Sequence, residues 1–217
     1  MLSRIITQSE GMVNYWFGPD DELDAALILS GDVDHEPHGR YCFQTTYLDE
    51  CYREYFEHHG DYQIVWMLRN PNSVIYSFLY NWPLDALDGT FSKSAAHLLT
   101  GIDKWVYQLV GVRGINRTKR ACLLYNAKAS QLFELKREFG RQRLMLVDYN
   151  DLVVNKESLL PKIYRFLGLD YKVEYAEKIH AQSLDKRKRL QSKEIRMIEA
   201  LSHPLYQNAV NLLNTED

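Results

Sequence analysis

One arginine at the end of an apolar run is the residue best suited to bind an anion. The run Tyr62–Leu68 is rich in β-branched and aromatic residues, which is typical of a strand covered on both faces. Arg69 follows it, and Asn70-Pro71 has the residue types of a helix start, with a capping side chain and then a proline. A helix N-terminus attracts anions, and a guanidinium can hold a phosphate through two parallel hydrogen bonds. We therefore expect an anion site at this junction.

A hydroxyl on the same helix is placed to share this site. Asn70, Ser73 and Ser77 are spaced i, i+3, i+7, so they lie on one helix face. Arg69 and the hydroxyl of Ser77 can then reach into one pocket. The alternative from these residues alone is an arginine in a surface salt bridge and a solvated serine.

The elements around the junction favour an α/β fold. A second apolar strand is predicted over 143–147, and strands that are apolar throughout and alternate with helices indicate a parallel sheet. Two strands are few for such a sheet. Long helices are predicted over 91–109 and 118–139. Further helices are predicted over 3–9, 20–29, 46–58, 70–82, 156–167, 192–202 and 204–214, and a short strand over 40–43.

The composition indicates one ordinary globular domain. The chain has 217 residues, 46% of them hydrophobic, and a net charge of −3, which is no signature of a nucleic-acid binder. No apolar run has the length of a membrane helix, and no signal peptide opens the chain. Three scattered cysteines fit neither a disulfide scaffold nor a zinc ribbon, so we expect reduced thiols and a cytoplasmic protein.

Charge is distributed unevenly along the chain. Residues 10–61 hold 13 acidic residues against two arginines, whereas residues 113–143 hold nine basic residues against two glutamates. The positive segment suits an anionic ligand, although helices with solvated charged faces give the same pattern. The segment His35-Glu36-Pro37-His38 has no further ligands at fixed spacing, so we expect a polar loop there and no metal site.

Three segments, in order, resemble the sulfotransferase family. Arg69-Asn70-Pro71 with Ser77 eight residues after the arginine is similar to the 3′-phosphate-binding segment of these enzymes. Val147–Leu152, followed by a helix ending in Phe166–Leu169, is similar to the family's strand, Tyr-Glu-Asp-Leu, helix and Phe-Leu-Gly stretch. Ser183–Ile195 resembles the late basic loop that closes over the donor nucleotide. The resemblance covers about residues 40–195.

The resemblance implies a P-loop-NTPase-like three-layer α/β sandwich, helix-rich with a small parallel sheet. It implies 3′-phosphoadenosine-5′-phosphosulfate as the sulfuryl donor, no metal, and a hydroxyl or amine acceptor, with a carbohydrate among the candidates. Arg69 and Ser77 would bind the 3′-phosphate. A second contact would come from the basic run Arg187, Lys188 and Arg189, for which the alternative is a solvated charge run. The oligomeric state is left open.

The chain departs from the family pattern at the 5′-phosphosulfate loop, a Gly- and Ser/Thr-rich turn after a strand. Gly111–Gly114 lies between helices and does not replace it. We therefore expect one N-terminally incomplete domain over residues 1–217, in which the first strand is missing. The alternative is a truncated or degenerate, non-catalytic family member with at most weak nucleotide binding, because backbone donors of such a loop stabilise the reacting anion.

The chain also departs from the family pattern at the catalytic base. Gln44-Thr45-Thr46 occupies the place where cytosolic relatives have Lys-Thr-His. Carbohydrate-type relatives have a glutamate soon after the first helix, and Glu22 is the nearest candidate here, with Glu10 behind it. The alternative for Glu22 is a structural role, in which its negative charge stabilises the first turn of a helix. A small-molecule kinase is a third hypothesis. It would need the same missing loop, and the chain lacks the Ser/Thr and the acidic strand end expected to hold Mg²⁺.

Overall fold

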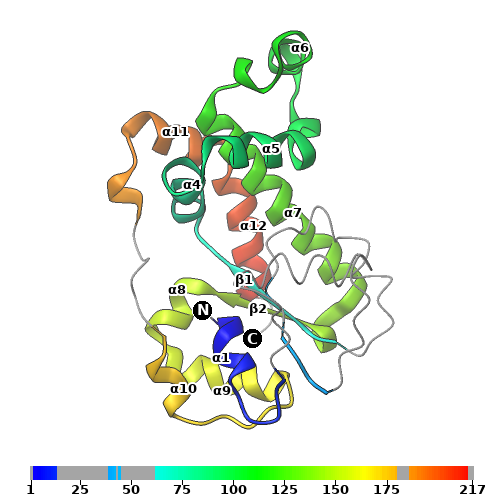
Figure 1. Ribbon diagram of the computed structural model, residues 1–217, viewed down its shortest axis with the longest axis vertical. Coiled ribbons are helices and arrows are strands. Elements are labelled where there is room, and N and C mark those ends of the chain that lie inside the picture. Colours follow the sequence, from blue (N-terminus) through cyan, green and yellow to red (C-terminus); the bar gives the residue numbers. More distant parts are fainter. Residues whose placement is uncertain (1, 14–38, 43, 45–61, 180–185, 215–217) are drawn as a thin grey trace. The chain divides into compact units, whose positions relative to one another are not determined.

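The computed structural model of the chain describes residues 2–13, 39–42, 44, 62–179 and 186–214 (Figure 1). These residues belong to two compact units, which are described separately below. The first unit comprises Met1–Ile64 with Asp151–His180, and the second comprises Val65–Asn150 with Ala181–Asp217. The helices predicted over 20–29 and 46–58 lie outside the described residues, as does Glu22. The prediction of one domain stays a prediction.

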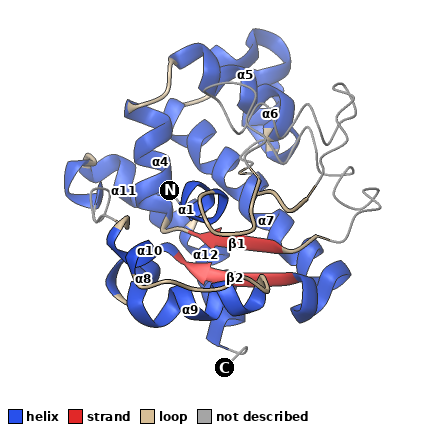
Figure 2. Cartoon of the chain, turned by 60° about the horizontal axis from the view of Figure 1, so that its bottom comes forward, coloured by secondary structure: helices blue, strands red, loops and turns tan. Residues whose placement is uncertain are grey.

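A small parallel sheet is formed by the two strands that the sequence predicts. Strand β1 (Ile64–Leu68) pairs with β2 (Leu144–Asp148), and helices connect them (Figure 2). Parallel strands require such a crossover, because the chain must return to the same end of the sheet. The described part of the chain thus confirms the helix-rich α/β class.

Helices build most of the second unit. Their core is centred on α7 (Arg117–Arg143), which contacts α4 (Pro71–Tyr80), α5 (Leu84–Ser94) and β2. The other helices of this unit are α6 (Gly101–Val110), α11 (Ser192–Leu201), α12 (His203–Asn214) and the 3₁₀ turns η1 (Ala96–Leu98), η2 (Gly111–Gly114) and η3 (Lys186–Arg189). Its fully buried side chains include Ile75, Leu87, Phe91, Leu124 and Ile198. The apolar faces predicted for these helices therefore meet in one core.

The first unit joins α1 (Leu2–Thr7) to α9 (Lys156–Phe166) and α10 (Glu174–Glu177). The hydroxyl oxygens of Ser9 and Tyr164 lie 2.6 Å apart in its interior, and the Tyr164 ring stacks on Tyr175. The short strand predicted over 40–43 is wrong for the residues described there, because a single bridge joins Arg40 to Met12. Helix α8 (Tyr149–Val154) carries the chain from the second unit into the first.

The long helix predicted over 91–109 is also wrong. Helix α5 ends at Ser94, a 3₁₀ turn follows, and α6 begins only at Gly101. Gly101 has a φ of 54°, a left-handed conformation that breaks a right-handed helix and that glycine adopts readily. The predicted stop at Gly140 is confirmed, since its φ of 61° interrupts α7. No helix among the described residues is long and apolar enough to cross a membrane.

Candidate functional site

The strand–helix junction forms as the sequence predicts. Strand β1 ends at the buried Leu68, and Asn70 is the N-cap of α4. The Asn70 side-chain oxygen accepts a hydrogen bond of 2.9 Å from the backbone N–H of Asn72, and Pro71 is the first helical residue. The cap fixes where the helix begins, so Arg69 is held between the end of the strand and the start of the helix.

Arg69 is contacted by two tyrosines, but two of its side-chain donors have no partner among the described residues. The hydroxyl of Tyr125, on α7, donates to the Arg69 carbonyl at 3.1 Å, and the Arg69 guanidinium carbon lies 4.5 Å from the ring centroid of Tyr149. The guanidinium Nε and Nη2 are buried and have no hydrogen-bond partner among the described residues. Buried donors without partners cost free energy. The guanidinium is therefore available to an anion.

Ser77 lies two turns further along the junction helix. Its side chain is half-buried, whereas Ser73, one turn earlier, is buried. The Asn81 amide donates to the Ser77 hydroxyl oxygen at 3.4 Å, which is a long hydrogen bond. The side chains of Ser77 and Arg69 do not bond to each other, so their action at one site stays a prediction.

Lys186, which the sequence analysis did not assign to the site, lies close to Arg69. The turn η3 packs against α4, and the Lys186 ammonium lies 5.4 Å from the ring centroid of Tyr76. Burial lowers the pKa of Lys186, and the positive charges of Arg69 and Arg189 lower this pKa further. The only sequence signal for Lys186 was its place at the head of the basic run. The fold thus gathers cations from segments more than 100 residues apart in the chain.

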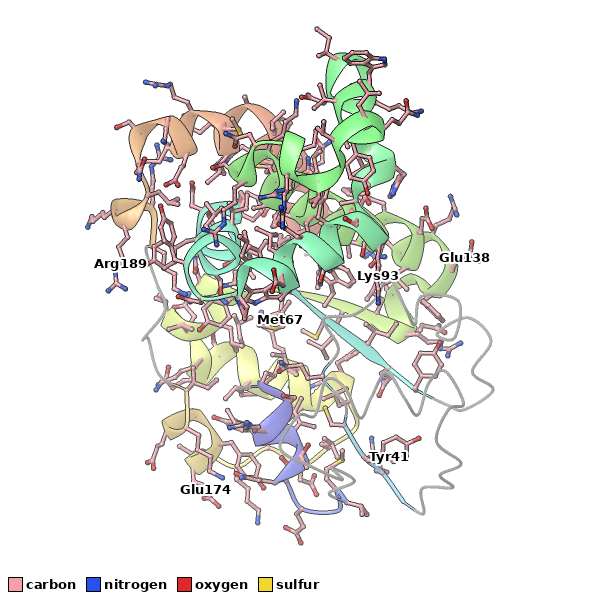
Figure 3. The ribbon with its side chains drawn as sticks, turned by 45° about the horizontal axis from the view of Figure 1, so that its top comes forward. Tyr41, Met67, Lys93, Glu138, Glu174 and Arg189 are labelled. Carbon is pink, nitrogen blue, oxygen red and sulfur yellow. The ribbon has the colours of Figure 1, made fainter. Side chains whose placement is uncertain are left out.

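The predicted residues of the basic run are more exposed than Lys186. Arg187 is ion-paired with Glu199 of α11 at 2.5 Å, and both side chains are nearly half exposed. Lys188 and Arg189 are exposed, and Figure 3 shows Arg189 at the outer side of η3. The assignment of Arg187, Lys188 and Arg189 to the donor site stays a prediction.

A histidine at the start of α12 contacts the first turn of α4. The His203 Nε2 lies 3.2 Å from the Asn72 side-chain nitrogen, which also donates to the Asn70 oxygen at 3.1 Å. Burial lowers the pKa of His203, while Glu199 raises it and Arg187 lowers it. A neutral ring can accept the hydrogen bond from the Asn72 amide. No local signal in the sequence points to His203, because its role depends on helix packing.

Asp148, at the end of β2, is held by two hydrogen bonds. One of its oxygens accepts from the Asn150 backbone N–H at 2.8 Å, and the other accepts from the Tyr206 hydroxyl at 3.3 Å. Burial and the Asp148 charge raise the pKa of Tyr206 to about 12, so this phenol keeps its proton as a donor. These bonds fix the segment that presents Tyr149 to Arg69.

Among the described residues, the remaining candidates from the sequence contribute no further catalytic or metal-binding group to the site. Glu22 and the histidines of the 35–38 segment lie outside them. The Gln44 side-chain oxygen accepts a hydrogen bond from Ser3 at 2.9 Å. In the part of the chain that is described, no three histidine, cysteine or acidic side chains gather as they would around a metal ion.

Comparison with known proteins identifies the family that the sequence resembles. The model of the sulfotransferase family matches residues 25–173. Among solved structures, the chain is similar to a sulfotransferase domain from the curacin biosynthetic pathway, with a TM-score of 0.48 and 15% identity. This similarity covers 83% of the present chain and 67% of that domain. No curated protein matches the chain in sequence.

Proposed function

Because this chain belongs to the sulfotransferase family, we propose that it transfers a sulfuryl group from 3′-phosphoadenosine-5′-phosphosulfate to a hydroxyl or amine of an acceptor. The observation that carries the proposal is the guanidinium of Arg69 at the start of α4, whose buried Nε and Nη2 have no partner in the part of the chain that the structure describes. The donor and the acceptor are both part of the proposal, with carbohydrates among the acceptors to be tested.

The 3′-phosphate of the donor is the anion that we assign to Arg69. Its two unpaired donors suit the two parallel hydrogen bonds of a guanidinium–phosphate pair. The start of α4 adds partial positive charge, which favours a phosphate at this end of the helix. Ser77 would donate its hydroxyl proton to the same phosphate, because in its long hydrogen bond with Asn81 the Ser77 oxygen is the acceptor.

Lys186 is the cation of the basic run that we assign to the same phosphate. It lies near Arg69, and in the free protein two positive charges there repel each other. A doubly charged phosphate would offset this repulsion and raise the pKa of the Lys186 ammonium, which burial lowers most in the free protein. Arg187 already has an acidic partner in Glu199, so we expect a smaller role for it, with exposed Lys188 and Arg189 at the edge of the site.

The transfer itself requires a bond to form and a bond to break at sulfur. The acceptor oxygen or nitrogen attacks the sulfur atom, and the bond from sulfur to the donor's phosphate oxygen breaks. The acceptor loses a proton to a base, for which we propose Glu22 from the sequence. The products are a sulfated acceptor and 3′-phosphoadenosine 5′-phosphate. Arg69 and Lys186 hold the donor by its 3′-phosphate and take no part in proton transfer.

Calorimetry with 3′-phosphoadenosine 5′-phosphate tests the assignment of Arg69. We expect Arg69→Ala to weaken binding about 100-fold, since hydrogen bonds to charged groups contribute about 1.5–3 kcal/mol each. Arg137→Ala is the matched control, because Arg137 is an exposed arginine of α7 with a neighbouring glutamate as its partner. Equal affinity of the wild type and Arg69→Ala would remove Arg69 from the donor site.

A further inference from the structure

A chain of three hydrogen-bonded side chains joins the start of α4 to the start of α12. The Asn70 oxygen Oδ1 accepts from the backbone N–H of Asn72 at 2.9 Å and from the Asn72 side-chain nitrogen Nδ2 at 3.1 Å. The same Nδ2 lies 3.2 Å from Nε2 of His203, the first residue of α12. Asn72 is only 4% exposed, so its amide depends on partners within the protein. The chain links α12 to the cap that sets where α4 begins, directly after Arg69.

The backbone fixes the direction of every bond in this chain. A backbone N–H is always a donor, so the Asn70 atom that it meets must be the side-chain oxygen. The Asn72 atom beside that oxygen must then be the amide nitrogen, because two acceptors do not pair. This nitrogen can only donate to His203, and Nε2 accepts only when it carries no proton. The intact chain therefore requires a neutral His203 ring with its proton on Nδ1.

Packing within the second unit sets the position of the His203 ring. The preceding residue, Ser202, is fully buried, and its hydroxyl donates to the Cys122 carbonyl of α7 at 3.4 Å. The ring meets the Tyr206 ring edge-on at 6.2 Å, and the Tyr206 hydroxyl donates to Asp148. His203 itself is half-buried, so water can exchange a proton with it. Protonation therefore changes the hydrogen bonding of a ring whose position is already set.

A protonated His203 ring cannot complete the chain. Its Nε2–H would face the Asn72 Nδ2, which is also a donor. Turning the Asn72 amide over would offer the ring the oxygen Oδ1, which has no partner among the described residues. The same turn would set that oxygen against the Asn70 oxygen and break the bond between the two asparagines. Either arrangement loses one hydrogen bond beside the cap of α4.

The charges around His203 favour the neutral ring. Burial lowers its pKa most; Glu199 of α11 raises this pKa and Arg187 of η3 lowers it, and these two residues are paired with each other. Helix α4 contains no charged residue, and Asp148 of β2 accepts from the Tyr206 hydroxyl. The titratable groups of α7 and α12 whose pKa is raised by burial stay uncharged at neutral pH, and they are Cys122, Tyr125 and Tyr206.

We propose that His203 is a positioning residue for the anion site, and that protonation of its Nε2 releases Asn72 and loosens the start of α4. The neutral ring holds the Asn72 amide, the amide holds the Asn70 oxygen, and the Asn70 cap holds the backbone that presents Arg69. An anion held by Arg69 then binds less tightly when the ring is protonated. The effect on nucleotide affinity rests on the function proposed above, whereas the hydrogen-bond switch does not.

Nuclear magnetic resonance of isotope-labelled protein tests the switch without a ligand. At neutral pH we expect a neutral His203 ring with its proton on Nδ1. As the pH falls, the ring should protonate with a pKa below about 6.5, and the Asn72 side-chain amide signals should move with the same midpoint. This movement should disappear in His203→Gln and persist in His97→Gln, the matched control in an exposed histidine of η1. A proton on Nε2 at neutral pH, or Asn72 signals that do not follow His203, would overturn the proposal.

Calorimetry with 3′-phosphoadenosine 5′-phosphate at about pH 7.5 and about pH 5.5 tests the effect on the site. The phosphates of the ligand also titrate in this range, so the proteins are compared in the same buffers. Glutamine offers an acceptor oxygen near the place of Nε2 and does not titrate. His203→Gln should therefore keep most of the wild-type affinity at the higher pH and bind about fivefold more tightly than the wild type at the lower pH, the effect of one hydrogen bond. His97→Gln should follow the wild type at both.

A leucine at position 203 imitates the loss of the acceptor. His203→Leu should bind the nucleotide about fivefold more weakly than the wild type at the higher pH, and circular dichroism checks that each variant is folded. Wild-type affinity at the lower pH that equals or exceeds that of His203→Gln would refute the positioning role, because the ring would then be neutral to binding or act as a cation. If neither protein binds the nucleotide, the function proposed above and the effect on affinity both fail, while the resonance titration still decides the switch.

Discussion

Replacing Arg69 by methionine should separate ligand binding from the stability of the free protein. The Arg69 side chain is stabilised by the Tyr149 ring, but its buried Nε and Nη2 have no partner within residues 2–13, 39–42, 44, 62–179 and 186–214. A cation–π contact contributes about 0.5–2 kcal/mol. An unsatisfied buried donor costs about 1–3 kcal/mol. Because these contributions oppose each other, we expect the free energy of unfolding of Arg69→Met without ligand to stay within about 1 kcal/mol of the wild-type value, or to rise.

The effect on the ligand-bound protein should be large. Two hydrogen bonds to a phosphate are worth about 3 kcal/mol together, so their loss weakens binding about 100-fold. Ligand at 100 times the wild-type Kd stabilises the fold by about 2.7 kcal/mol. For a chain of this length that raises Tm by about 5–11 °C. In Arg69→Met the same ligand concentration is near Kd, and the rise should be about 1–2 °C.

The assay is thermal unfolding with and without 3′-phosphoadenosine 5′-phosphate. Arg137→Met is the control, since the Arg137 side chain is 72% exposed and should change neither Tm nor the ligand effect. If Arg69→Met keeps the full wild-type rise in Tm, the phosphate lies elsewhere. If its Tm without ligand falls by much more than the control's, the guanidinium has a structural partner and the argument from unpaired donors is wrong.

Three further predictions concern charge, capping and pH. Lys186→Ala should weaken nucleotide binding about tenfold in calorimetry, and Arg187→Ala should weaken it less than about threefold, because Arg187 is already paired. Asn116→Ala removes two hydrogen bonds to the start of α7, so urea unfolding should show a loss of about 1 kcal/mol. The pKa of Tyr206 is raised to about 12 by burial, so stability should fall as pH rises from about 10 to 12, because the unfolded chain loses this proton first. In Tyr206→Phe the fall measured by urea unfolding at each pH should be shallower.

The strand–helix junction could be predicted because its signals are local. An apolar run, a capping side chain and a proline specify where β1 ends and α4 begins, and each acts within a few residues of Arg69. The same reasoning failed over 91–109, where the helical periodicity of the side chains continues but Gly101 takes a left-handed conformation. Periodicity indicates which residues share a face and does not reveal a break in the backbone.

Lys186 and His203 could not be predicted, because their surroundings come from helix packing. Lys186 belongs to a run of four basic residues with no local difference among them. Packing of η3 on α4 brings Lys186 over Tyr76, while Arg187 pairs with Glu199. Such long-range contacts form only when the chain folds back and closes the intervening loops. Short-range sequence patterns carry little information about which of these contacts form.

The residues assigned to the donor's 3′-phosphate all belong to one compact unit. Arg69, Ser77 and Lys186 lie within Val65–Asn150 and Ala181–Asp217, as does the bracing Tyr149. Their geometry is set by the packing of α4 against α7 and η3 within that unit. Nucleotide binding by these residues therefore does not require a particular placement of the first unit. It follows that a substitution in the core of the first unit, such as Ile163→Ala in α9, should reduce the free energy of unfolding. Calorimetry should show that the affinity of the folded variant for 3′-phosphoadenosine 5′-phosphate is unchanged. A change of affinity as large as that of Arg69→Ala would show that the site depends on both units.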